Sequence, residues 1–259
     1  AVSSATPFLL GVLGLLALGG LVWVEGRVSQ PLLSGLLFRS RVALSAMSTK
    51  LLMGAALIIA MVTVPLMADT VLGQSPLEGG LRLMRLTGAL PVGAVLGGLL
   101  AYRVGARNIT LAGLSVAATG LFLMSGWGLN IADPQMTAHL ALAGFGFGLV
   151  IAPIFMTAVD AGGAEYLATS ASLVTVARMM GMALGMAALS AWGMEQFQGL
   201  TAGLDFPLPL AGETEAAFSA RFTQYQAQTA QASISLFQSF FRGAAILLLA
   251  ALAPALGMG

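Results

Sequence analysis

The chain contains no cysteine, one histidine and few charges, since Asp, Glu, Lys and Arg make up 8% of its 259 residues. The lack of cysteine excludes a disulfide framework and a thiolate metal site. The lack of a Gly-Lys-Ser/Thr phosphate loop excludes an ATPase of that class. A formal net charge of +1 argues against a nucleic-acid partner. The sequence offers no catalytic set, metal cluster or cofactor site and predicts a protein that is not an enzyme.

Apolar residues are abundant instead, at 58% of the chain, with a mean hydropathy of +0.93. Soluble domains carry about 25% charged residues, so this composition predicts an integral membrane protein whose solvent is the lipid bilayer. The apolar runs are too long for the alternating strands of a β-barrel. They predict an all-α, polytopic transmembrane bundle of seven helices, at residues 5–24, 42–67, 80–102, 108–128, 137–159, 166–193 and 236–258.

The chain divides into four parts by composition. Phe218, Phe222 and Tyr225 lie at i, i+4 and i+7 in the third part, which favours a short amphipathic helix. That helix is expected to rest on its own bundle, with a lid or partner-binding element as the alternative. The parts are a first transmembrane helix with a cytoplasmic amphipathic linker (1–41), the core helices (42–193), an extracytoplasmic loop with the amphipathic segment (194–235) and a last transmembrane helix (236–259).

Arginines are distributed unequally between the two sides of the predicted membrane. Arg27, Arg39, Arg41, Arg103 and Arg107 fall on one side. The other side carries Arg82, Arg85, Arg221 and Arg242. The positive-inside rule therefore predicts that the first side, with the C-terminus, is cytoplasmic.

A short basic turn lies between the third and fourth predicted helices, in the stretch GLLAYRVGAR. Gly105 permits a positive φ in a tight connection, and Arg103 and Arg107 can reach lipid headgroups. With Gly98, these residues resemble the cytoplasmic-loop signature of the major facilitator superfamily, G-x-L-a-D-r-x-G-r-r. Tyr102 stands where that signature has aspartate.

Four further stretches resemble the 14-helix drug:proton antiporters of that superfamily. They are PLLSGLLFRSR (31–41), ADTVLGQSPLEGGL (68–81), SASLVTVARMMGMALGMA (170–187) and SFFRGAAILLLAAL (239–252). The resemblance is to the last seven helices. It implies the C-terminal half of a proton-coupled multidrug exporter in the bacterial inner membrane, with an N-terminal half bundle, protons and a small amphipathic substrate as partners. The alternative is a half-transporter that anchors or scaffolds a larger membrane complex without transporting.

Charged residues within predicted spans are costly in hydrocarbon and commonly face a cavity or a polar partner. Lys50 and Arg178 are two such cations, and Thr175 lies one turn before Arg178. Arg178 is expected either to face the central cavity, or pair there with an acidic group, or to bind carbonyls at a helix contact. These three residues are the candidate transport residues.

Four acidic residues are candidates for proton coupling or for helix-end contacts: Asp69, Glu78, Asp160 and Glu165. Glu78 lies one turn before Arg82 and is expected to pair with it. Glu165 suits a helix N-terminus. The single histidine, His139, is expected to be an interfacial polar residue, with a proton-relay role as the alternative.

Glycine pairs at G-x-x-x-G spacing predict close helix contacts. Pro91 and Pro153 fall within predicted helices and are expected to kink or break them. The fourteen methionines fill the core or line an adaptable cavity. The glycine pairs are Gly93/Gly97, Gly144/Gly148 and Gly181/Gly185.

Overall fold

The computed structural model describes residues 40–163, 166–204, 206–208 and 214–258. Within them, six helices are long and apolar enough to cross a membrane, which confirms the polytopic helical bundle. The chain is therefore an integral membrane protein. The helices are α3 (Arg41–Thr70), α4 (Pro76–Val104), α5 (Ala106–Met124), α6 (Asp133–Gly162), α7 (Leu167–Thr201) and α8 (Glu215–Ala255), followed by the 3₁₀ turn η2 (Leu256–Met258).

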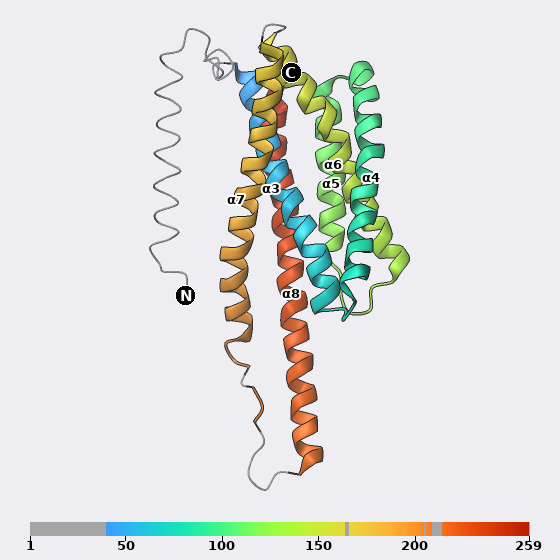
Figure 1. The fold of residues 1–259 in the computed structure, drawn as a ribbon, viewed down its shortest axis with the longest axis vertical. Helices are drawn as coiled ribbons and strands as arrows, with labels where there is room; N and C mark the ends of the chain where they lie inside the picture. Colours follow the sequence, from blue (N-terminus) through green and yellow to red (C-terminus); the bar gives the residue numbers. More distant parts are fainter. Residues whose placement is uncertain (1–39, 164–165, 205, 209–213, 259) are drawn as a thin grey trace, which may run out of the picture.

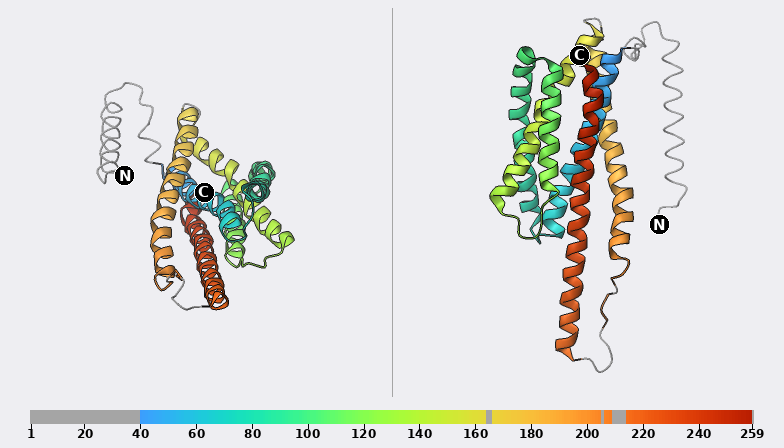
Figure 2. Two further views of the ribbon diagram at one scale, coloured as in Figure 1. Left: turned by 60° about the horizontal axis from the view of Figure 1, so that its bottom comes forward. Right: turned by 180° about the vertical axis from the view of Figure 1, so that it is seen from behind.

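The helices form two groups that share the core (Figures 1 and 2). In one group α6 packs against α4 and α5, and in the other α3 packs against α7 and α8. Further contacts of α3 with α6 and of α5 with α8 join the groups. Buried aromatic and aliphatic side chains such as Phe147, Phe241 and Leu121 fill the space between them.

Glycine permits the close approach of α4 and α6. A Cβ atom at Gly144 would lie 2.0 Å from the carbonyl oxygen of Leu86, and one at Gly148 would lie 2.2 Å from that of Leu90. A Cβ atom at Gly97 would lie 2.3 Å from the Leu149 carbonyl oxygen. No side chain fits at such distances, so the predicted packing role of these glycines is confirmed.

The predicted spans from 42–67 to 166–193 each correspond to one helix, from α3 to α7. The connection between α4 and α5 is shorter than expected. Arg103 belongs to α4 and Arg107 to α5, and Gly105 alone joins the two helices, with φ +94°. The predicted helix at 5–24 and most of its linker lie outside the described residues.

The segment 194–235, predicted as a loop, is largely helical. Helix α7 continues to Thr201, and the amphipathic segment is not a separate short helix but the first half of α8. The 41 residues of α8 span about 60 Å, twice the roughly 30 Å of a hydrocarbon core. Figure 1 shows α8 reaching well beyond the ends of α3 to α6. We call residues 215–235 the extension, and the end of the bundle from which they protrude the extension end.

Pro91 and Pro153 lie inside continuous helices. The expectation that they break these helices is therefore wrong. Proline at 153 leaves the Leu149 carbonyl without its helical donor. That carbonyl faces Gly97 of α4, where the absent side chain leaves room for a weak Cα–H···O contact. Several methionines, including Met53, Met67 and Met124, are buried in the core, which supports core filling for them.

Candidate functional site

Helices α3 and α7 cross in close contact because glycines line the crossing. A Cβ atom at Gly181 would lie 1.9 Å from the Leu51 carbonyl oxygen, and one at Gly185 would lie 2.7 Å from Ala55 Cα. On α3, a Cβ atom at Gly54 would lie 2.5 Å from the Arg178 carbonyl oxygen. This contact places the two intramembrane cations on adjacent helices at the same level.

Lys50 and Arg178 line one cavity of about 340 Å³ between α3, α6 and α7. Thr175 lines it as well, so the structure brings all three candidate transport residues together. Helix α6 supplies apolar walls, among them Phe155 and Met156. The cavity is thus an apolar chamber with two cationic side chains.

Among the described residues, the cations have no acidic neighbour in the cavity. Lys50 is 4% exposed, and no described Asp or Glu belongs to the lining. The Thr175 hydroxyl donates to the Ala171 carbonyl at 3.0 Å. A buried charge without a partner or counter-ion is costly. The chamber is therefore chemically suited to accept an anionic group, such as a carboxylate from a facing surface.

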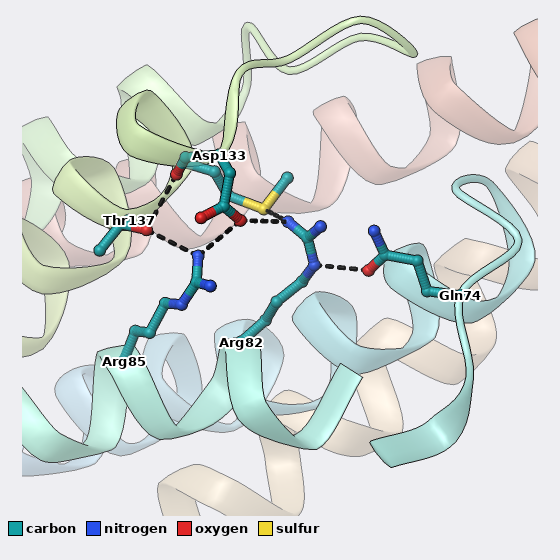
Figure 3. A network of polar contacts seen from close by, with 6 residues as sticks. Gln74, Arg82, Arg85, Asp133 and Thr137 are labelled. Carbon is teal, nitrogen blue, oxygen red and sulfur yellow. Dashed lines mark hydrogen bonds and ion pairs between the residues drawn. The ribbon is translucent and has the colours of Figure 1, made fainter. Parts of the chain in front are cut away.

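A second polar group lies at the extension end, between the starts of α4 and α6 (Figure 3). Arg85 donates to Asp133 Oδ1 at 2.7 Å and to the Thr137 hydroxyl at 2.6 Å. Arg82 lies 3.7 Å from the same carboxylate oxygen and donates to the Gln74 side chain and to Met136 Sδ. The carboxylate of Asp133 therefore links two arginines of α4 to α6.

This network corrects the predicted pairing of Glu78 with Arg82. Glu78 instead accepts from the Ser75 backbone at 2.8 Å and from the Ser75 hydroxyl at 3.0 Å, and forms a capping box at the start of α4. The sequence carries the signal for this box, Ser-x-x-Glu before an apolar run.

The other acidic candidates are dispersed. Asp69 is exposed near the end of α3, and Asp160 is exposed near the end of α6. Neither lies in the cavity of Lys50 and Arg178. Glu165 lies outside the described residues.

In the loop motif, Arg103 and Arg107 are exposed on either side of Gly105. A Cβ atom at Gly105 would meet nothing within 4 Å, so the backbone angle and not space requires glycine there. Gly98 lies on the α4 face that contacts α6, where a Cβ atom in its place would lie 3.5 Å from the Ala152 methyl group. The motif thus forms a tight basic turn at the end opposite the extension.

His139 accepts a hydrogen bond at Nδ1 from the Trp127 indole, at 3.0 Å. The Trp127 ring also packs edge-on against Phe241 of α8, and its carbonyl accepts from the Gln238 side chain at 2.8 Å. His139 therefore helps to hold the α5–α6 loop against α8.

Sequence reasoning missed several members of these clusters: Gln74, Trp127, Asp133, Thr137 and Gln238. Most of these residues contact partners that are distant in the sequence, so no local spacing in the sequence predicts the contacts. Asp133 and Thr137 are the exception, because they lie one helical turn apart.

The fold and the cavity define a polytopic helical membrane protein with a cationic chamber between its helices. The chain matches no protein-family model. It is 39% identical over 201 residues to a triacylglyceride transporter of Mycolicibacterium hassiacum, covering 74% of this chain and 37% of the relative. It is 35% identical over 218 residues to the triacylglyceride transporter of Mycolicibacterium smegmatis, covering 80% of this chain and 39% of the relative.

The triacylglyceride transporter of Mycobacterium tuberculosis strain H37Rv is 37% identical over 195 residues, which cover 70% of this chain and 38% of the relative. The chain therefore spans less than two fifths of the length of these curated relatives.

Proposed function

We propose that the chain is one half of a transporter for lipophilic compounds, in which the chamber of Lys50 and Arg178 faces a second helical bundle. The observation that carries the proposal is the pair of cations in a mainly apolar cavity to which no described residue contributes a carboxylate. A facing bundle that supplies a carboxylate would neutralise Arg178. Protonation of that carboxylate would release the contact, which is a route to proton coupling.

The faces of α4 and α7 that no described residue covers support a second bundle. In the most apolar stretch of each helix, 17% of α4 and 28% of α7 is buried, against 61% of α3 and of α6. Val95 on α4 and Leu184 on α7 are each more than half exposed. Transporters of this kind enclose a midplane site between two bundles.

The names of the relatives favour a lipophilic cargo, with a triacylglyceride as the first candidate and amphipathic drugs as the second. A triacylglyceride carries no charge, so the two cations would serve gating and proton coupling while apolar walls contact the cargo. A proton-coupled exporter of the major facilitator type, in a bacterial inner membrane, remains the proposed class.

Transport by reconstituted proteoliposomes tests this proposal. The chain is produced together with the N-terminal half bundle that the proposal requires, and the movement of a fluorescent triacylglyceride analogue and of a fluorescent lipophilic cation is followed under a pH gradient. We expect Arg178→Ala to reduce transport at least about tenfold, the factor that matches loss of one buried charged contact. Ser172→Ala, on an exposed turn of the same helix, serves as the matched control and should transport normally.

The chain alone should not transport. Proton-driven transport by the monomeric chain would contradict the half-transporter. Absence of transport in both preparations would favour the scaffold, and normal transport by the Arg178 variant would refute the role of the chamber.

A further inference from the structure

A groove of about 390 Å³ runs along the outer surface of the bundle between α5 and α8, away from the chamber of Lys50 and Arg178. Helix α5 contributes Ser115, Thr119 and Phe122, and α8 contributes Arg242, Ile246 and Leu249. Small alanine side chains on both helices form its floor. Apart from Arg242 and the two hydroxyl residues, the lining of the groove is apolar.

The face that carries the groove is apolar and exposed. Phe122 is 65% exposed, Ile246 63% and Leu249 53%. Both helices cross the membrane, so these side chains contact lipid chains unless protein covers them. The hydroxyls of Ser115 and Thr119 donate to carbonyls of their own helix, at 2.9 and 2.8 Å. They therefore offer the groove no free donor.

Arg242 is the charged residue of the groove. In the part of the chain that the structure describes, no acidic residue lines the groove with it. Arg242 is exposed, and no hydrogen bond or ion pair to a described residue occupies its guanidinium group. An exposed cation beside an apolar groove is complementary to a phospholipid, whose phosphate is anionic and whose acyl chains are apolar.

The depth of Arg242 matches a headgroup. It lies thirteen positions before Ala255, the last residue of α8, which corresponds to about 20 Å of a hydrocarbon core of about 30 Å. Helical side chains lean toward the helix N-terminus, and α8 begins at the extension end. The long arginine side chain thus reaches toward the headgroups of the leaflet at that end.

We propose that the α5–α8 groove binds an anionic phospholipid of this leaflet. The phosphate pairs with Arg242, and one acyl chain lies in the groove along Ile246 and Leu249. The site is separate from the proposed transport chamber, so a test of lipid binding at the groove does not depend on the proposed function.

Quenching of a groove tryptophan by brominated lipid tests the site in nanodiscs of the full chain. Phe122→Trp supplies the reporter, and the unmodified chain supplies the background of its three native tryptophans. Brominated phosphatidylglycerol or brominated phosphatidylcholine is added at the same low fraction to a phosphatidylcholine bilayer. We expect phosphatidylglycerol to be enriched at the reporter by about fivefold, the contribution of one arginine to an anionic lipid surface.

Arg242→Gln should abolish this preference, and Arg242→Lys should retain part of it. Because Arg242 is exposed, both variants should fold, which circular dichroism checks. Val95→Trp, on the exposed face of α4, is the control and should be quenched equally by both lipids. Equal quenching at the Phe122→Trp reporter, or a preference that survives Arg242→Gln, would overturn the proposal.

Discussion

A single residue sets the geometry of this bundle where the backbone must adopt dihedral angles that other residue types rarely reach. Gly105 joins α4 to α5 at φ +94° and ψ 142°, a combination open essentially to glycine alone. The sequence predicts this requirement, because two antiparallel helices that meet across so few residues must turn sharply. It does not predict that Arg103 and Arg107 remain helical on either side.

Gly105→Ala should lower the free energy of unfolding by about 1 to 3 kcal/mol, the usual cost of a strained backbone position. Thermal unfolding in detergent measures the change. Gly88→Ala is the matched control, since Gly88 lies inside α4 with open space around its Cα. It should stabilise the helix by about 0.5 to 1 kcal/mol. Equal effects of the two substitutions would contradict this account of Gly105.

At the scale of helices, the hydropathy of the sequence predicts where the membrane-spanning helices lie. Apolar runs mark the parts that cross hydrocarbon, so the bounds of α3 to α6 are found within a few residues, whereas α7 continues past its predicted end to Thr201. The extension is polar, and its aromatic periodicity predicts a helix but not its continuity with the last span. The proximity of Lys50 and Arg178 depends on which helices cross. Gly181 and Gly185 predict a close contact, but nothing local identifies α3 as the partner.

The α4–α6 contact allows a test with two adjacent glycines. Gly97→Ala would place a methyl group 2.3 Å from the Leu149 carbonyl oxygen, whereas Gly98→Ala would place one at an ordinary 3.5 Å from Ala152. Gly97→Ala should therefore lower the free energy of unfolding by about 1 to 3 kcal/mol. Gly98→Ala should leave it unchanged or raise it slightly, as measured by the same unfolding assay. A larger loss for Gly98→Ala would show that α4 and α6 pack through a different face.

At the scale of the molecule, the two ends of the bundle differ in character. One end carries the basic turn around Gly105, and the other carries the Arg82–Arg85–Asp133 network and the extension (Figure 1). The positive-inside rule predicts that the Gly105 end is cytoplasmic. The long polar extension is then expected outside the cell membrane.

Engineered cysteines test this orientation without background, because the chain contains no cysteine of its own. In intact cells, an impermeant thiol reagent should label Ser219→Cys in the extension and not Arg107→Cys at the basic turn. Permeabilised cells should show labelling of both, which verifies that each site is reactive. The reverse pattern in intact cells would invert the topology.

The unbroken course of α8 has a mechanical consequence. The same rod packs in the core through Phe241 and Leu248 and, beyond the bundle, holds the returning chain through Arg221, which donates to the Leu208 carbonyl at 3.0 Å. When a rigid body pivots, displacement grows with distance from the axis. A small rotation of the bundle within the bilayer would therefore displace the far tip of α8 much more than the part of the helix that lies inside the bundle.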